Sequence, residues 1–141
     1  MKNILIGGYY GAGNLGDEAI LDSMLRDMRA LRSDLSFFVT SWNPDETSKQ
    51  YAVKGVYWKD INALLDAGQQ ADMIILGGGG LFQDYWGMDP KTYLRKGAWG
   101  IPEYGSLPLL ANILGIPCMI YAVGVGPLLS ELAREHTRLA F

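Results

Sequence analysis

Short apolar runs alternate with amphipathic stretches along the whole chain. Each run is closed by glycine or polar residues, a pattern typical of strands that are buried on both faces of a sheet. The predicted strands are Ile4–Ile6, Leu35–Thr40, Val53–Trp58, Met73–Leu76 and Pro117–Val123.

Helices are predicted between these runs. From Ala19 to Leu31, apolar residues recur at the spacing of one helical face. Capping and turn residues predict the other helices. They are a short helix from Asn43-Pro44 to near Tyr51, one over Ile61–Gln69, one over Leu107–Leu114, and a last one from Pro127 to the C-terminus. The segment Phe82–Tyr104 shows no regular period.

This alternation predicts a single α/β domain over residues 1–141. We expect a Rossmann-like, doubly wound parallel sheet of about five strands, with helices on both faces. Because crossovers between parallel strands are right-handed, few topologies remain, and the order 3-2-1-4-5 is the one we expect.

Three glycine-rich turns follow the first, fourth and fifth predicted strands. They are Gly7–Asp17, Gly77–Gly80 and Gly124–Gly126. The carboxyl ends of parallel strands meet at one edge, so these turns are expected to form one crevice. Four consecutive glycines exceed the need of a tight turn, which predicts close backbone approach to an anion or a sugar. The candidate binding residues are Gly8, Tyr9, Gly11, Asn14, Asp17, Gly78, Gly79, Gly80, Asp84, Gly124 and Gly126.

Gly11–Gly16 matches the G-x-G-x-x-G pattern of dinucleotide-binding loops. Three features argue against that function. The motif does not follow the strand directly, and no acidic residue follows the second strand to hold a ribose. Most important, Asp17 and Glu18 occupy the start of the helix, where they would repel a pyrophosphate.

The same carboxylates allow two interpretations. Acidic residues in a first helical turn stabilise the helix dipole without any further function. Asn14 and Asp17, however, lie at the mouth of the predicted crevice, where they are candidates to bind sugar hydroxyls, with Asp17 as a candidate base.

Aromatic residues are concentrated in the irregular segment and give a candidate stacking surface for a sugar ring, although core packing is an alternative for about half of them. They are Tyr85, Trp86, Tyr93, Trp99 and Tyr104. The basic residues Lys91, Arg95 and Lys96 are interpreted as a solvated face in preference to an anion-binding patch.

Composition excludes several classes of protein. A net charge of −3 argues against a nucleic-acid-binding module. No apolar run is long enough for a membrane span, and no Cys/His pattern indicates a metal site. Cys118 lies in an apolar run and is expected to be buried, whereas His136 is expected to be exposed on the last helix. No candidate nucleophile–histidine pair is present.

The segments GYYGAGNLGDEAIL, LGGGGLFQD and MIYAVGVGPL, in this order, resemble the N-terminal half of the polysaccharide pyruvyl transferase family, which includes CsaB-type enzymes. The resemblance implies the N-terminal half of a GT-B-like two-domain enzyme. It also implies transfer of a pyruvyl group from phosphoenolpyruvate to two hydroxyls of one sugar in a cell-wall or surface polysaccharide, which gives a ketal.

By this resemblance, catalytic and donor-binding residues are expected in a C-terminal domain, because the chain ends at Phe141 before it. The resemblance implies phosphoenolpyruvate as a co-substrate and implies no cofactor. Expected partners are a sugar or lipid-linked saccharide and the C-terminal domain, and a homo-oligomer is left open. The expected location is the cytoplasm, with peripheral membrane association open.

Two alternatives remain open at this point. One is the nucleotide-sugar-binding half of another GT-B-like glycosyltransferase, and the other is a non-catalytic binding domain. The segment Tyr85–Tyr104 is longer and more aromatic than the family pattern suggests, which leaves the identity of the acceptor sugar undetermined.

Overall fold

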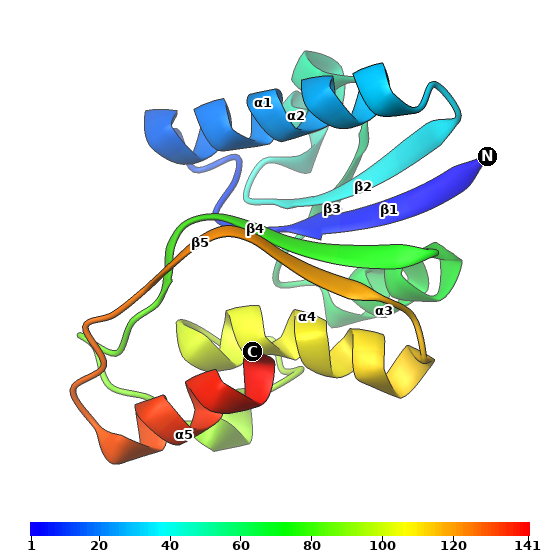
Figure 1. The fold of residues 1–141 in the computed structure, drawn as a ribbon. Coiled ribbons are helices and arrows are strands. Elements are labelled where there is room, and N and C mark those ends of the chain that lie inside the picture. The colour runs from blue at the N-terminus through cyan, green and yellow to red at the C-terminus, as the bar shows by residue number, and fades with distance from the viewer.

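A computed structural model describes residues 1–141 and contains one five-stranded, all-parallel sheet (Figure 1). The strands are β1 (Lys2–Gly7), β2 (Leu35–Ser41), β3 (Lys54–Tyr57), β4 (Met73–Phe82) and β5 (Cys118–Val125). The helices are α1 (Leu15–Leu31), α2 (Pro44–Tyr51), α3 (Ile61–Gln70), α4 (Ile101–Leu114) and α5 (Glu131–Ala140). The strand order is β3-β2-β1-β4-β5, which confirms the predicted topology.

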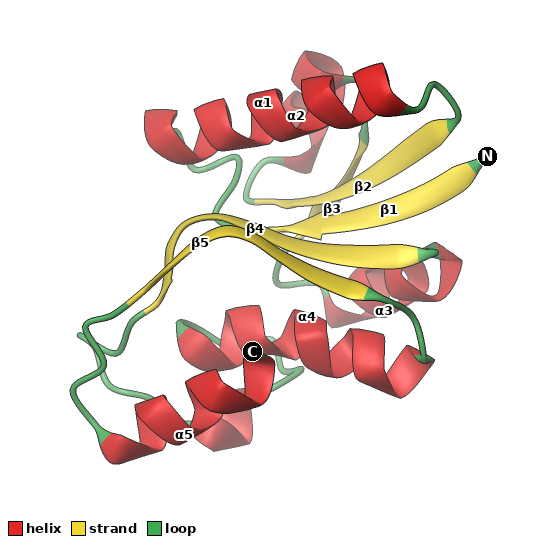
Figure 2. Ribbon diagram, viewed as in Figure 1, coloured by secondary structure: helices red, strands yellow, loops and turns green.

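Helices cover both faces of this sheet, as Figure 2 shows, with α1 and α2 on one side and α3, α4 and α5 on the other. Alternate residues of the central strands therefore enter two separate cores. Leu5 and Ile74 belong to the core beneath α3 and α4, whereas Ile6 and Ile75 belong to the core beneath α1. Burial on both faces explains why these strands are continuous apolar runs in the sequence.

The four glycines 77–80 are part of a strand, contrary to the prediction of a loop after Leu76. β4 continues through them to Phe82 and pairs with β5, and a register shift lies between Gly79 and Phe82. Gly78 and Gly79 have φ values of +90° and +78°, which side-chain-bearing residues rarely adopt. The glycines 77–80 therefore allow the irregular part of β4 to stay paired with β5. Gly124 likewise belongs to β5 and not to a loop.

Two helix starts also differ from the prediction. α4 begins at Ile101, well before Leu107, because Pro102 fits the first turn of a helix. Within α4, the hydroxyl of Ser106 donates a hydrogen bond of 2.6 Å to the carbonyl oxygen of Pro102. α5 begins at Glu131 and not at Pro127, because the Ser130 side chain caps it. The irregular segment before α4 contains only a short 3-10 helix, η1 (Pro90–Thr92).

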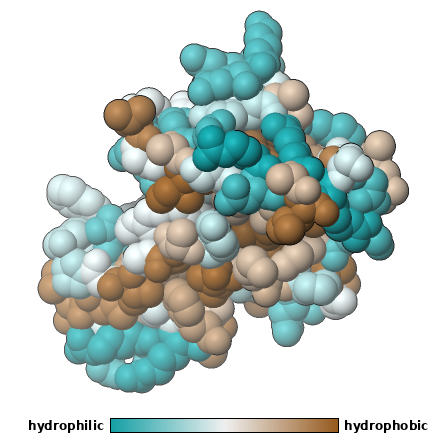
Figure 3. Space-filling model, turned by 45° about the horizontal axis from the view of Figure 1, so that its top comes forward, coloured by the Kyte–Doolittle hydropathy of each residue, from teal (hydrophilic) through white to brown (hydrophobic).

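β5 forms the outer edge of the sheet, and much of it is exposed. The prediction that Cys118 is buried is wrong, because this residue lies on the edge strand. Met119, Tyr121 and Val125 keep 43%, 41% and 50% of their surface exposed. Figure 3 shows a hydrophobic band on the side of the molecule where the carboxyl ends of β4 and β5 lie. No helix in the structure is both long and apolar enough to cross a membrane.

Candidate active-site crevice

The strands β1, β4 and β5, which carry or precede the three glycine-rich segments, are neighbours in the sheet, but a side chain of the protein fills the space beside Gly8 and Gly78. Tyr10 is fully buried, and its hydroxyl donates a hydrogen bond of 2.5 Å to the carbonyl oxygen of Gly77. A Cβ atom on Gly8 would lie 2.6 Å from the Tyr10 ring, and one on Gly78 would lie 2.9 Å from its hydroxyl oxygen. Packing around Tyr10 therefore explains Gly8 and Gly78 without a ligand.

Asp17 lies further out, against the irregular part of β4. A Cβ atom on Gly79 would overlap its Oδ1 atom, so the glycine makes room for the carboxylate. Asp17 is only 9% exposed, although it belongs to the first turn of α1. Burial, and secondarily the charge of Glu18, raises the pKa of Asp17, and no hydrogen bond to its carboxylate offsets them. The result is a carboxylate poised to accept a proton.

Asn14 and Glu18 are occupied by contacts within the chain. The Oδ1 atom of Asn14 accepts hydrogen bonds from the backbone N–H groups of Gly16 and Asp17 and so caps α1. Glu18 accepts from the backbone N–H of Gly11 and from the Tyr51 hydroxyl, each at 2.7 Å. The backbone N–H groups of Gly11, Gly16 and Asp17 are thus already bonded within the chain, which agrees with the argument against a dinucleotide site.

Asp84 is 3% exposed and points to the loop that precedes α5. Its Oδ1 accepts a hydrogen bond of 2.6 Å from the backbone N–H of Leu129. Its Oδ2 accepts from the backbone N–H and the hydroxyl of Ser130, at 2.9 and 2.7 Å. These bonds, that from Leu129 first, hold the pKa of Asp84 below its usual range. The side chain therefore ties the segment after β4 to the segment after β5.

The remaining candidate glycines differ in how open they are. Gly124 lies against β4, because its Cβ position is 3.3 Å from the Cα atom of Gly80. Gly126 donates its backbone N–H to the carbonyl oxygen of Phe82 at 2.7 Å. Gly80 is exposed, and no atom lies within 4 Å of its Cβ position. Tyr9 is 38% exposed at the end of β1. Of the candidates, Tyr9, Asn14, Gly80 and Gly124 are exposed, whereas Asp17 is nearly buried.

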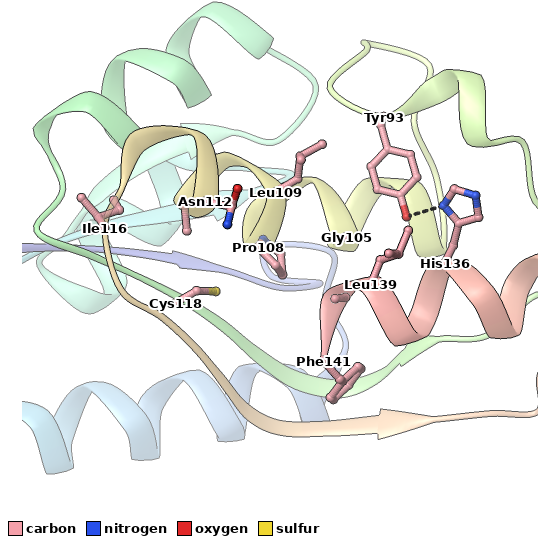
Figure 4. Close-up of a pocket in the computed structure, with 12 residues that line it drawn as sticks. Tyr93, Gly105, Pro108, Leu109, Asn112, Ile116, Cys118, His136, Leu139 and Phe141 are labelled. Carbon is pink, nitrogen blue, oxygen red and sulfur yellow. Dashed lines mark hydrogen bonds between the residues drawn. The ribbon is translucent and has the colours of Figure 1, made fainter.

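The five predicted aromatics do not gather on one surface. Tyr85 and Trp86 are exposed, and Trp99 is 36% exposed. Tyr93 lies instead at one end of an apolar cavity of about 810 Å³ between α4, β5 and α5, where its hydroxyl is 3.3 Å from Nδ1 of His136 (Figure 4). His136 is therefore half-buried, contrary to the expected exposure. Tyr104 lines a separate hollow at the end of β1.

Lys91, Arg95 and Lys96 are exposed, as expected for a solvated face. Lys96 also borders a polar hollow of about 430 Å³ beside Tyr57 and Lys59. No three side chains of the histidine, cysteine, aspartate and glutamate types gather in a way that would hold a metal ion.

A second cluster at this edge was not predicted from the sequence. The rings of Trp42 and Trp58, which follow β2 and β3, lie 4.3 Å apart between centroids at an angle of 55°. Nζ of Lys59 is 4.0 Å from Oε2 of Glu103 in the first turn of α4. The available signal was Trp58 at the end of the predicted strand Val53–Trp58, with Lys59 directly after it. Glu103 was hidden because the helix was predicted to begin after it, at Leu107.

Comparison with known proteins gives one match. The family model described as polysaccharide pyruvyl transferase matches residues 14–141. No curated protein and no solved structure matches the chain. The matched region includes Asp17, the glycines of β4 and β5, and the Lys59–Glu103 pair. Because the match covers most of its length, the chain belongs to the polysaccharide pyruvyl transferase family.

Proposed function

We propose that this chain forms the acceptor-binding half of a two-domain, GT-B-like enzyme. The enzyme transfers a pyruvyl group from phosphoenolpyruvate to two hydroxyls of one sugar residue in a cell-wall or surface polysaccharide, on a free or lipid-linked saccharide. Family membership supports pyruvyl transfer in general. The identity of the donor, the identity of the acceptor and the two-domain arrangement are our proposals.

The chemistry requires groups that take up protons. When phosphoenolpyruvate becomes a ketal, its C3 atom gains one proton and its C2 atom forms two bonds to sugar oxygens. Phosphate leaves with the electron pair of the C2–O bond. Each sugar hydroxyl loses one proton, so the two released protons balance those gained by C3 and by the departing phosphate. A carboxylate near each hydroxyl lowers the barrier to these steps.

The position of Asp17 is the observation that carries the proposal. Its carboxylate lies against Gly79, which the exposed Gly80 follows in β4, at the carboxyl edge where ligands of open α/β sheets bind. Its raised pKa makes it a better proton acceptor than an ordinary surface aspartate. We therefore assign to Asp17 the role of base for a sugar hydroxyl.

The charge at this edge supports the proposal that this chain binds the acceptor and that a second domain binds the donor. Asp17 and Glu18 place negative charge at this edge, which suits a neutral sugar and repels the anionic donor. The phosphate and carboxylate of phosphoenolpyruvate need cationic partners. We propose that a second α/β domain provides them across the crevice, and we expect residues 1–141 alone to show no turnover of phosphoenolpyruvate.

The test compares Asp17→Asn with Asp27→Asn in the intact protein. Asp27 is exposed on the same helix, so its variant controls for the loss of one charge. Variants are incubated with phosphoenolpyruvate and saccharide acceptors, and ketal formation is followed by mass spectrometry and phosphate release. We expect kcat to fall about 10²- to 10⁴-fold for Asp17→Asn only. Wild-type protein that releases no phosphate with any acceptor would contradict the proposed reaction.

A further inference from the structure

Two tryptophans lie at the carboxyl ends of β2 and β3, and the proposed reaction uses neither of them. Trp42 follows β2, Trp58 follows β3, and their rings lie 4.3 Å apart between centroids. Trp42 keeps 42% of its surface exposed, whereas Trp58 is partly buried behind it. Tryptophan combines a large apolar area with a polar N–H group, so an exposed indole that packs on a second one is typical of a binding surface.

The backbone on both sides of the Trp42 ring is fixed by hydrogen bonds. The N–H group of Trp42 donates to the carbonyl oxygen of Tyr10 at 2.9 Å. The N–H group of Asn43 donates to Oγ of Ser41, also at 2.9 Å, and the side chain of Asn43 caps α2. The indole is therefore held in place before any ligand arrives, which reduces the conformational entropy that binding would cost.

Trp58 is supported in turn by a nearly buried charged pair. Nζ of Lys59 lies 3.4 Å from the centroid of the Trp58 ring, a cation–π contact. The same atom lies 4.0 Å from Oε2 of Glu103 and donates to the carbonyl oxygen of Ala98. The side chains of Lys59 and Glu103 are only 19% and 17% exposed. The pair thus holds the indole on which Trp42 rests.

Hydrogen bonds also connect Trp42 to the loop that leads to Asp17. The tyrosine that accepts from Trp42 precedes Gly11, whose backbone N–H donates to Glu18 in the first turn of α1 at 2.7 Å. In the sheet, β2 is next to β1, and β1 is next to β4, against which Asp17 lies. Two strand spacings, about 10 Å, therefore separate β2 from β4, which is comparable to the length of a disaccharide.

Polar groups border this aromatic pair. A hollow of about 510 Å³ begins at Asn43, directly after Trp42, and is lined by Asn43, Asp45, Glu46, Lys49 and Gln50. A second hollow, of about 430 Å³, is bordered by Lys59, Asp60 and Asn62 after Trp58. Carboxylate, amide and ammonium groups together can accept from and donate to hydroxyl groups. This combination suits a sugar, whose ring has an apolar face of C–H groups and a rim of hydroxyls.

We propose that Trp42, supported by Trp58, stacks against the pyranose ring of the sugar residue next to the one that receives the pyruvyl group. This inference rests on the proposed function, in which the chain binds a saccharide acceptor. The stacked ring undergoes no reaction, and its contact with Trp42 orients the neighbouring residue toward Asp17. A nucleobase also stacks well on an indole. The carboxylates in the first turn of α1 repel the phosphate groups of a nucleotide, however, so a neutral sugar is favoured.

The first experiment compares acceptors of two lengths in the intact protein. Phosphate release from phosphoenolpyruvate is measured with methyl glycosides of neutral and N-acetylated disaccharides and of the matching monosaccharides. For Trp42→Ala we expect KM for the disaccharides to rise about 10-fold, with kcat and the KM for the monosaccharides unchanged. Trp42→Phe keeps an aromatic ring and should raise KM by less than about 3-fold. Tyr121→Ala removes an aromatic side chain of similar exposure from β5 and should change neither constant.

The second experiment detects the contact without turnover. The intact protein is labelled with 5-fluorotryptophan, and the fluorine NMR signal of Trp42 is identified by its loss in Trp42→Phe. We expect the disaccharides to shift this signal in a saturable way. The signal of Trp86, which is 82% exposed in the segment after β4, should stay in place. UMP serves as the nucleotide probe in a parallel titration.

The two experiments separate the inference from the proposed function. If the wild type transfers pyruvyl groups and Trp42→Ala keeps the wild-type KM for the disaccharides, the inference is wrong while the proposed function stands. If the wild type transfers no pyruvyl group, the proposed function fails and the fluorine titration decides alone. A saturable shift of the Trp42 signal by a disaccharide then supports the stacking site. No shift with any saccharide, or a shift with UMP only, refutes it.

Discussion

Asp84 offers a stability test that follows directly from its contacts. The change is Asp84→Asn, which preserves size but removes the charge and one of the two acceptor oxygens. The carboxylate accepts three hydrogen bonds, from the backbone of Leu129 and from the backbone and hydroxyl of Ser130. An amide NH₂ group that faces N–H donors cannot replace them. The variant should therefore loosen the link between the segments after β4 and β5.

The size of the effect follows from these three bonds. Hydrogen bonds to a charged group contribute about 1.5–3 kcal/mol each, but the loop at Leu129 and Ser130 is exposed and can hydrate when released. We therefore expect a loss of about 2–4 kcal/mol in the free energy of unfolding, and a fall in Tm on the order of 10 °C. Urea unfolding at constant m value measures the first quantity. Asp89→Asn, at an exposed position of the same segment, should change it by less than about 0.5 kcal/mol.

The pH dependence gives a second check with a defined sign. Because hydrogen bonds from Leu129, and then from Ser130, lower the pKa of Asp84 in the folded state, its stabilising contribution is present above the unfolded pKa of about 4. It is lost as the pH falls through the lower, folded pKa. The difference between wild type and Asp84→Asn should be constant from about pH 5 to 7 and shrink below about pH 4. Equal stability of Asp84→Asn and Asp89→Asn at pH 7 would refute the reasoning.

Two further substitutions test the packing beside β4. Gly79→Ala should lower the free energy of unfolding by more than about 1 kcal/mol, because the φ of Gly79 is +78° and the new methyl group would overlap the Asp17 carboxylate. Gly80→Ala, with open space at its Cβ position, should leave the free energy of unfolding nearly unchanged, and paired urea titrations compare the two variants. Tyr10→Phe should lower the free energy of unfolding, measured by heat or urea, by about 1–2 kcal/mol, because it removes the buried hydrogen bond to the carbonyl oxygen of Gly77. A change near zero would mean that this hydrogen bond contributes nothing to stability.

The sequence was sufficient for the topology because the strands are buried on both faces. Runs such as that of Ile4–Ile6 carry the signal of a central parallel strand, and the alternation with helices limits the order of the strands. The end of β4 could not be read in the same way. Glycine has no side chain to contribute to a hydrophobic pattern, so Gly77–Gly80 looked like a loop, although backbone pairing to β5 holds it in the sheet.

The start of α4 and the Lys59–Glu103 pair could not be predicted from the sequence, for related reasons. Pro102, Gly105 and Pro108 are poor helix formers, and α4 is apolar on most sides, so it lacks an amphipathic period. Tertiary packing decides its conformation. Glu103 and Lys59 are far apart in the sequence, and only the fold brings them together. Asp17 could be singled out from the sequence because its position depends on a local feature, the first turn of α1.

In the proposed reaction, Gly79 of β4 would affect the chemistry indirectly. Gly79 leaves the space in which the Asp17 carboxylate is buried, and burial is the largest cause of its raised pKa. A methyl group at this position would push the carboxylate outward into water, where its pKa falls toward the ordinary value. The base would then be weaker, and the acidic limb of the pH–rate profile would move to lower pH. In Gly79→Ala that limb should shift, whereas in Gly80→Ala it should not, since no atom lies within 4 Å of that Cβ position. On this account Gly79 sets the strength of the proposed base without contacting the sugar.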